Sequence, residues 1–181
     1  MSLEDEYRDQ PEQVHWEGRY IVAKTRGRWE YVSRTRNIKA AVILAVDQGH
    51  VLLVEQFRVP LGRPCIELPA GLIGDHEGEE DEDAAVAAAR ELEEETGYRA
   101  GRIESLGEFH SSPGMVTEAF TLFRAHNLEK VSDGGGVEGE GITVHRVALT
   151  EIEPFLASKR ADGYAIDVRM LLLLAPGIMP G

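Results

Sequence analysis

The sequence predicts a mixed α/β fold. Short segments rich in Val, Ile, Tyr and Thr dominate the first half of the chain, as expected of β-strands. One central segment, from about Asp81 to Gly97, has the composition of a helix, and two helical stretches follow near the C-terminus. The length of 181 residues suits one ordinary domain, and no internal repeat or long linker divides it.

Most of the expected elements are strands. Residues 1–17 are polar, and we expect a loose or partner-docked arm there. The sequence Asp47-Gln48-Gly49 between two apolar segments is typical of a hairpin turn, and Pro69-Ala70-Gly71 requires a turn. We expect strands at about 18–25, 28–36, 38–46, 50–58, 64–68, 103–110, 118–125 and 141–149, and late helices at about 150–159 and 164–175. We divide the chain into an N-terminal arm with strands, 1–37, and a main domain, 38–181.

Charge is concentrated in two blocks. The chain has 32 acidic and 19 basic residues, a net charge of -13, which disfavours binding to nucleic acid. Eleven acidic residues and one basic residue lie between Asp75 and Glu95, whereas seven basic residues and one acidic residue lie between Gly18 and Lys39. The two blocks suggest a site that holds cations and anions together, although charge runs are usually solvated faces.

Cysteine content and hydropathy indicate the compartment. The single Cys65 cannot form an intramolecular disulfide, and its apolar setting suggests a buried, inert thiol. The acidic N-terminus has no apolar signal-peptide segment, and the longest apolar run is too short to span a membrane. We therefore expect a cytoplasmic protein without a membrane partner.

The central helix carries a cluster of carboxylates. At 100° per residue, Glu91, Glu94 and Glu95 share one face. Like charges at these spacings repel, and a divalent cation among them would relieve the repulsion. Oxygen ligands without His or Cys favour Mg²⁺ or Mn²⁺, while a solvated Glu-rich helix is the alternative. The face expected to pack on a sheet consists of Ala85, Ala89, Leu92 and Thr96.

The stretch from Arg90 to Tyr98, Arg-Glu-Leu-Glu-Glu-Glu-Thr-Gly-Tyr, resembles the core of the Nudix box. The protein thus resembles a Nudix hydrolase, a resemblance that implies an α/β/α sandwich with a mixed β-sheet, preceded here by a β-rich segment. The box places a further Glu eight positions before the Arg, and Glu82 occupies that position. Glu79 is an alternative, because the loop after Gly71 is about five residues longer than in the family.

Other segments resemble the ADP-ribose pyrophosphatase branch. Cys65 to Ile73 is similar to the segment before the box, where a backbone carbonyl joins the metal ligands, which implies a ligand role for Ala70. A Ser-Pro-Gly segment after the box, Ser112 to Met115, implies substrate contacts. The further substrate-binding residues that the resemblance implies are Gly114, Met115, Glu118 and Arg58, the last of them meeting the diphosphate.

The basic segment 28–35 resembles a strand that supplies an aromatic side chain for adenine stacking. Trp29 is the first candidate and Tyr20 the second, although aromatic residues in strands are usually core residues. Arg58 and one or more of Arg26, Arg28 and Arg34 could neutralise the diphosphate.

The Gly-rich segment 134–141 resembles a mobile loop that delivers the catalytic base in this branch. Glu138 is favoured by position and Glu140 is second; a disordered acidic surface loop is the alternative. Its spacing of glycines is not a dinucleotide-binding motif, because a strand-like segment follows it.

The resemblance implies Mg²⁺-dependent hydrolysis of a nucleoside diphosphate sugar, with ADP-ribose giving AMP and ribose 5-phosphate. It implies that Glu91, Glu94, Glu95 and Ala70 bind the metal, that Glu94 also belongs to the catalytic residues, and that Arg90 orients the carboxylates. It further implies a homodimer in which the N-terminal segment contributes to the partner's site. Alternatives are GDP-mannose or ADP-glucose as substrate, and a non-catalytic nucleotide sensor. A Ca²⁺ buffer is disfavoured because the sequence has no EF-hand loop.

Overall fold

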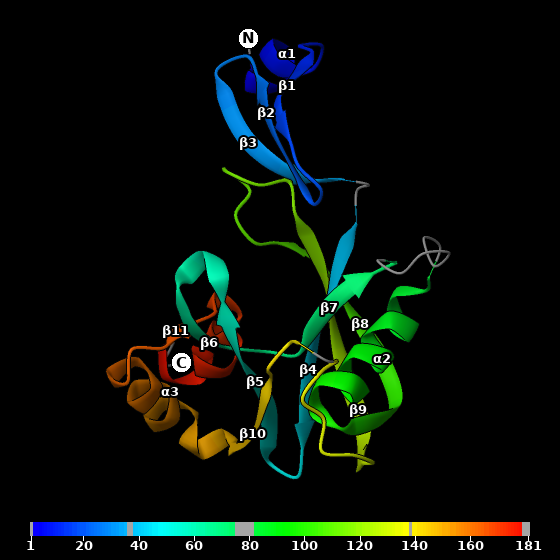
Figure 1. The fold of residues 1–181 in the computed structure, drawn as a ribbon, viewed down its shortest axis with the longest axis vertical. Coiled ribbons are helices and arrows are strands. Elements are labelled where there is room, and N and C mark those ends of the chain that lie inside the picture. The colour runs from blue at the N-terminus through cyan, green and yellow to red at the C-terminus, as the bar shows by residue number, and fades with distance from the viewer. Residues whose placement is uncertain (1, 36–37, 75–81, 138, 179–181) are drawn as a thin grey trace.

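The computed structural model describes residues 2–35, 38–74, 82–137 and 139–178. They form a mixed α/β body and a separate antiparallel sheet at the N-terminus (Figure 1). The predicted architecture, a mixed β-sheet between helices with a β-rich N-terminal segment, is confirmed.

The N-terminal sheet contains three antiparallel strands: β1 (Glu12–Glu17), β2 (Ile21–Arg26) and β3 (Trp29–Arg34). A short helix, α1 (Leu3–Tyr7), precedes them. The expectation of a loose arm at 1–17 is therefore wrong, because α1 and β1 form there. The strand arises because Val14 and Trp16 continue an apolar pattern that pairs with β2, across a bulge at the intervening residue.

The sheet of the body is mixed. Its order is β11-β6-β5-β4-β9-β8, with β10 added to β5 and β7 added to β4. Pairs β4–β9 and β6–β11 are parallel and the others antiparallel. The strands are β4 (Lys39–Asp47), β5 (His50–Arg58), β6 (Arg63–Glu67), β7 (Ala70–Ile73), β8 (Tyr98–His110), β9 (Ala119–Lys130), β10 (Thr143–Ala148) and β11 (Ala165–Ile166).

The predicted hairpin between β4 and β5 is confirmed. Asp47 pairs with His50, and the two residues between them, Gln48 and Gly49, have φ values of 47° and 72°. Positive φ at both positions is the conformation that suits the twist of a two-residue hairpin. The turn therefore fixes the register of the two central strands.

Helices cover both faces of this sheet. On one face, α2 (Ala84–Thr96) packs Ala88 and Leu92 against Ile43 of β4. On the other face, α3 (Ile152–Ala161) packs Leu156 near Val42, the next residue of β4. Adjacent residues of one strand thus face opposite cores, as the pleat requires.

Helix α2 ends at the predicted Gly97 and begins three residues after the expected start. Its packing face agrees with the expected one at Leu92 and Thr96, which are buried. It differs among the alanines, because Ala87 and Ala88 are buried whereas Ala85 and Ala89 are only partly covered.

The expected helix at 164–175 is wrong in its first half. Residues 165–166 form β11 instead, because they pair with Cys65 and Ile66 at the edge of β6. A single turn, η4 (Val168–Met170), then leads into α4 (Leu171–Ile178). Short turns η2 (Val59–Leu61) and η3 (Leu149–Glu151) complete the elements.

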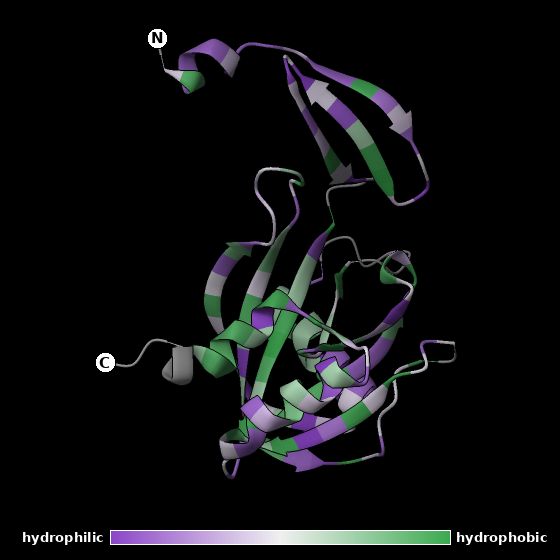
Figure 2. Cartoon of the chain, turned by 90° about the vertical axis from the view of Figure 1, so that its left-hand side faces the viewer, coloured by the Kyte–Doolittle hydropathy of each residue, from purple (hydrophilic) through white to green (hydrophobic). Residues whose placement is uncertain are grey.

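The N-terminal sheet stands apart from the body in both views (Figures 1 and 2). The connection between β8 and β9 reaches it: the backbone of Val32 donates to Met115 (2.9 Å) and accepts from Thr117 (3.0 Å). The strands of this sheet leave large apolar side chains exposed, among them Val14 and Trp16. Such exposed apolar surface is typical of an interaction site.

Candidate active site

Helix α2 carries the predicted acidic face, and its capped ends fix the direction of each side chain. Asp83 caps the N-terminus, where its Oδ1 accepts hydrogen bonds from the backbone N–H groups of Ala85 (2.9 Å) and Val86 (3.2 Å). Gly97 ends the helix at φ +75°, and a Cβ there would collide with the backbone of Ser132. The Glu residues of the last two turns are therefore held in one register against the sheet.

Arg90 gathers the acidic side chains around it. Its Nη1 donates to Glu91 (2.8 Å) and Glu94 (3.3 Å), and its Nε donates to Glu82 (3.3 Å). Burial opposes the charge, but the hydrogen bond to Glu82 and the surrounding carboxylates raise the pKa of the guanidinium above its usual range. The arrangement suits an orienting role. Glu82, preferred by spacing, lies in this cluster, and Glu79 lies outside the described residues.

Glu95 points into the protein and is only 6% exposed. Its Oε2 accepts a hydrogen bond from the backbone N–H of Ala70 (3.0 Å). Burial raises the pKa of this carboxyl to about 8, and the nearby charges of Glu91 and Glu140 contribute to the rise. The spacing of 100° per residue predicted that Glu95 lies on the charged face of the helix. In the structure it is a buried carboxylate that connects α2 to β7.

Gly71 allows α2 to approach β7 closely. A Cβ at this position would collide with the side chain of Glu91. The neighbouring Ala70 pairs with Val42 of β4, so the sheet holds its main chain beneath the helix. The predicted main-chain ligand, Ala70, thus lies next to Glu91 and Glu95, two of the three predicted carboxylates.

The acidic face of α2 offers oxygen ligands of the kind that a divalent cation binds. Within the described parts of the chain, no three His, Cys, Asp or Glu side chains already point at one common centre, since Glu91 and Glu94 bond Arg90 and Glu95 bonds the Ala70 N–H. Burial is the main cause of the raised pKa of Glu95, and the nearby charges of Glu91 and Glu140 add to it. Carboxylate and carbonyl oxygens at this point match the preference of Mg²⁺ and Mn²⁺.

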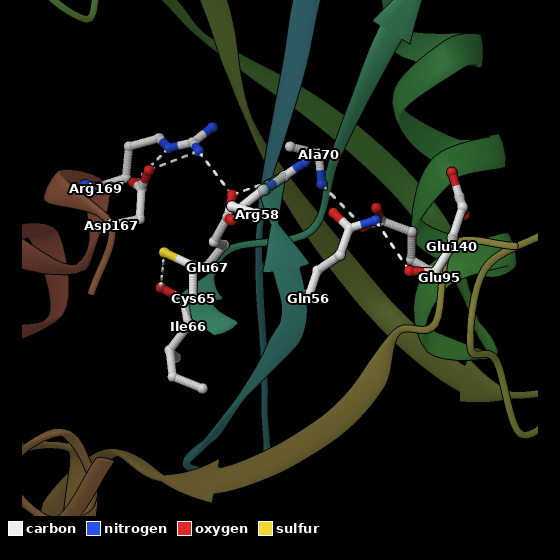
Figure 3. A network of polar contacts seen from close by, with 10 residues as sticks. All are labelled: Gln56, Arg58, Cys65, Ile66, Glu67, Ala70, Glu95, Glu140, Asp167 and Arg169. Carbon is white, nitrogen blue, oxygen red and sulfur yellow. Dashed lines mark hydrogen bonds and ion pairs between the residues drawn. The ribbon is translucent and has the colours of Figure 1, made fainter. Parts of the chain in front are cut away.

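A cleft of about 790 Å³ brings six of the predicted site residues together. It lies between the end of α2, strand β7 and the hairpin β5–β6, and Figure 3 shows its two sides. The predicted site residues that line it are Ala70, Glu91, Glu95, Glu140, Arg58 and Glu118.

The Gly-rich segment is attached to the end of α2. The N–H groups of Gly135 and Gly136 donate to two carbonyls of its last turn (2.8 and 3.0 Å), which would otherwise lack partners. Glu140 then lines the cleft, and its Oε2 accepts a hydrogen bond from the Val137 N–H (2.9 Å). The first candidate for the base, Glu138, lies outside the described residues.

Three arginines line the cleft, and two of them, Arg58 and Arg34, pair with Glu67 and Glu118. Arg58 makes a fork to Glu67, with Nε–Oε1 at 2.6 Å and Nη2–Oε2 at 2.8 Å, and the hydrogen bonds raise the pKa of the guanidinium. Arg34 of β3 donates through Nε to Glu118 (2.7 Å). The second pair connects the N-terminal sheet to the cleft of the body.

The structure does not bring Trp29, Gly114 and Met115 into the same cleft. Trp29 and Gly114 line a separate pocket of about 470 Å³ on the N-terminal sheet. Met115 is exposed and lines a third pocket beside Val32. Within one chain, the residues expected to hold a base are thus separated from those expected to hold a diphosphate.

Tyr20 and Arg28 lie in the turns of the N-terminal sheet. Tyr20 is 62% exposed, and the guanidinium of Arg19 lies 5.1 Å from its ring centroid. Arg28 is exposed in the turn between β2 and β3. Neither belongs to the residues that line the 790 Å³ cleft.

Sequence reasoning missed several residues of the cleft wall: Gln56, Glu67, Asp167 and Arg169. Glu67 stood within the recognised segment before the box, but nothing in its spacing distinguished it. Asp167 and Arg169 fell in a stretch expected to be helical. Cys65 is buried as predicted, and burial raises the pKa of its thiol to about 12, which keeps it protonated.

Comparison with known proteins identifies the family. The model of the NUDIX domain matches residues 35–166, a range that includes α2 and the whole cleft except Arg34, Asp167 and Arg169. The chain belongs to the Nudix family, and it is a Nudix hydrolase.

Three curated relatives are similar over most of the chain. An ADP-ribose pyrophosphatase of Bacillus subtilis is 37% identical over 72% of this chain and 71% of its own length. A GDP-mannose pyrophosphatase of Cronobacter sakazakii is 36% identical, over 76% and 71%. A methanol dehydrogenase activator of Bacillus methanolicus is 37% identical over 66% of this chain, and the match spans 63% of that protein.

A solved structure supports the fold. The crystal structure of an ADP compounds hydrolase superposes with a TM-score of 0.63 over 81% of this chain and 80% of its own, at 21% sequence identity. Among the described residues, no helix is long and apolar enough to span a membrane.

Proposed function

We propose that the protein hydrolyses the diphosphate of a nucleoside diphosphate sugar, with ADP-ribose as substrate and AMP and ribose 5-phosphate as products. The observation that carries the proposal is the composition of the cleft, in which buried and partly buried carboxylates of α2 share one space with Arg58. A diphosphate needs both, since cations held by carboxylates and a guanidinium can contact its oxygens together. The relatives' names support this substrate class.

Glu91, Glu94, Glu95 and the main chain of Ala70 would hold Mg²⁺, or Mn²⁺ in its place. Bound there, the metal would neutralise charge on the diphosphate and lower the pKa of a water molecule. Arg90 holds Glu91 and Glu94 in position through its Nη1. Glu95 is held from the other side by the Ala70 N–H.

A carboxylate of the Gly-rich segment would act as the base. It takes a proton from the attacking water, the water oxygen forms a bond to phosphorus, and the bond from that phosphorus to the bridging oxygen breaks. We keep Glu138 as the first candidate, because Glu140 already uses its Oε2 to close a turn with Val137. Glu140 remains the second candidate, since it lines the cleft.

The nucleoside would bind at the N-terminal sheet. Trp29 and Gly114 offer an aromatic face and an open backbone in one pocket. Met115 lies next to this pocket, and Tyr20 and Arg28 would add contacts from the turns. Glu118 and Arg58 would hold the part of the substrate nearer the metal.

We further propose a cytoplasmic homodimer in which segment 1–37 of one protomer contributes to the site of its partner, attached to the main domain at 38–181. Two observations support it. The N-terminal sheet exposes large apolar side chains, which an interface with a second protomer would bury. The base pocket and the diphosphate cleft are separate within one chain.

A hydrolysis panel tests the substrate. ADP-ribose, GDP-mannose, ADP-glucose, NADH and diadenosine polyphosphates are incubated with the protein and Mg²⁺, and the products are separated by chromatography. We expect the highest kcat/KM for ADP-ribose. GDP-mannose is the second candidate, because a relative with that name matches as much of the chain. Absence of turnover on every nucleotide sugar would contradict the proposal.

A further inference from the structure

Four charged side chains form a continuous network at the end of the cleft away from α2 (Figure 3). Arg58 bonds Glu67 through a fork at 2.6 and 2.8 Å. Arg169 reaches the same carboxylate with its Nη2 (3.3 Å) and makes its own fork to Asp167 at 2.6 and 2.8 Å. The network therefore has two positive and two negative groups, and three parts of the chain supply them.

Strand register explains how these residues meet. Gln56 of β5 pairs with Cys65 of β6, so Gln56, Arg58, Cys65 and Glu67 lie on one face of the hairpin. That face lines the cleft. Arg58 extends back past Cys65 to reach Glu67.

The C-terminal part of the chain completes the network from the side. Strand β11 pairs with β6 in parallel, and the backbone N–H of Asp167 donates to Ile66 (3.0 Å). Asp167 also accepts from the backbone N–H of Arg169 (2.8 Å), which begins the turn η4. These contacts fix Arg169 against Glu67, a residue 102 positions earlier in the chain.

Burial differs between the two partners of the central pair. Glu67 is 3% exposed, whereas the side chain of Arg58 is 41% exposed. A carboxylate this deeply buried must have ionic partners. The guanidinium uses Nε and Nη2 for the fork and presents the rest of its surface to the cleft.

Such a pair adds little net stability, because desolvation offsets most of the attraction. Its physical consequence is geometric. An arginine at the end of a strand samples many rotamers, and a fork to a buried carboxylate selects one of them. A guanidinium fixed before the ligand arrives binds an anion with less loss of entropy.

We propose that Glu67 is a positioning residue that holds Arg58 ready for an anionic oxygen of the substrate, and that Arg169 holds Glu67. The proposal rests on the proposed function, in which Arg58 contacts the diphosphate. Glu67 itself touches no substrate, so its effect must pass through Arg58. This dependence makes the proposal testable by a double-mutant cycle.

The experiment measures kcat and KM for ADP-ribose with the full-length protein and Mg²⁺. The variants are Arg58→Ala, Glu67→Gln, Arg169→Gln and the two double variants with Arg58→Ala. We expect Arg58→Ala to raise KM about tenfold or more, as loss of a charged hydrogen bond does. Glu67→Gln should raise KM about fivefold, and Arg169→Gln less, with kcat changed less than KM. In the Arg58→Ala background both effects should fall below about twofold.

Glu55→Gln is the matched control. Glu55 lies on the opposite face of the same strand and is bonded by Lys159 (2.8 Å) and Tyr164 (3.1 Å). It is a partly buried, ion-paired carboxylate outside the cleft, so its loss should leave KM unchanged. Thermal unfolding of every variant identifies any that fails to fold. If Glu67→Gln does not fold, Arg169→Gln tests the proposal in its place.

Each outcome has a definite meaning. If Arg58→Ala leaves KM unchanged, the diphosphate contact in the proposed function is wrong, and this proposal falls with it. If Arg58→Ala raises KM while Glu67→Gln and Arg169→Gln do not, positioning is overturned and the proposed function stands. An effect of Glu67→Gln that persists without Arg58, or an equal effect of Glu55→Gln, would also overturn the proposal.

Discussion

The buried carboxylate of Glu95 accepts a hydrogen bond of 3.0 Å from the backbone N–H of Ala70. This contact joins the acidic face of α2 to strand β7. It holds one proposed metal ligand directly against another, and it does so with the side chain only 6% exposed. The position of the carboxylate thus depends on the packing of the helix on the sheet.

Replacing Glu95 by Gln should remove most of the activity and leave the fold intact. The amide keeps the size of the side chain and can still accept from the Ala70 N–H, but it loses the charge that a cation needs. A metal contact worth several kcal/mol in the transition state corresponds to a fall in kcat of about 10²- to 10³-fold. Steady-state kinetics at saturating Mg²⁺ measures the fall, and circular dichroism checks the fold.

Glu93→Gln is the control for this experiment. Glu93 lies on the same helix but pairs with Arg99 at the surface (2.8 Å), so we expect near-normal kcat. A Glu95→Gln variant with normal turnover would remove Glu95 from the metal ligands.

The metal-free protein should lose stability as the pH rises from about 4.5 to about 8. Burial raises the pKa of Glu95 from 4.5 to about 8, so between these values the folded state binds a proton that the unfolded state does not. The contribution of this group is full below pH 4.5 and is lost as the pH rises through 8. Its size is on the order of a few kcal/mol.

Urea unfolding in EDTA, at several pH values, measures this dependence. We expect the difference in unfolding free energy between wild type and Glu95→Gln to change across this range, and Mg²⁺ to raise the stability of the wild type at pH 8. Parallel stability curves for the two proteins would show that the carboxyl titrates normally.

The two acids of the Gly-rich segment should differ in their effect on turnover. We expect Glu138→Gln to lower kcat by about 10²- to 10⁴-fold, the contribution of a general base. Glu140→Gln should cost less, because one of its oxygens bonds the Val137 N–H. The measurement is kcat at saturating substrate for both variants. The reverse order would assign the base to Glu140.

Trp29→Ala should raise KM for ADP-ribose more than it lowers kcat. The ring is 45% exposed and lines a pocket with Gly114, so its loss removes contact area with a base and little from a core. Stacking of a base on an aromatic ring is worth about 1–3 kcal/mol, or about fivefold to a hundredfold in KM.

Tyr20→Ala serves as the comparison for Trp29. The guanidinium of Arg19 already lies over its ring, 5.1 Å from the centroid, and we expect a smaller rise in KM. If KM is unchanged in Trp29→Ala, the ring has no part in binding the base.

Helix α2 with its acidic face was predictable because its signals are local. The signals lie within a few turns of one another: they are the helix-forming residues, the spacing of Glu91, Glu94 and Glu95, and Gly97 at the end. The same reasoning failed at 164–170, where Ala165 pairs with the edge of β6. Pairing with a distant strand overrides local helix preference, and no window of sequence contains that information.

The cleft wall also combines features that the sequence predicts with features that depend on long-range contacts. The segment before the box was recognised, yet Glu67 within it had no assigned role. Its importance comes from Arg58, nine residues away, and from Arg169, 102 residues away. Buried ion pairs between distant residues follow from strand register and burial, which only the folded chain defines.

The sequence by itself determined the family, the acidic helix and the kind of metal that its carboxylates suit, because these depend on residue type and short spacing. The tertiary structure alone decided that Glu95 is buried against Ala70, that Arg58 is held by Glu67, and that Trp29 lies in a pocket separate from the cleft. The physical reason is that burial and electrostatic environment depend on which distant segments pack together.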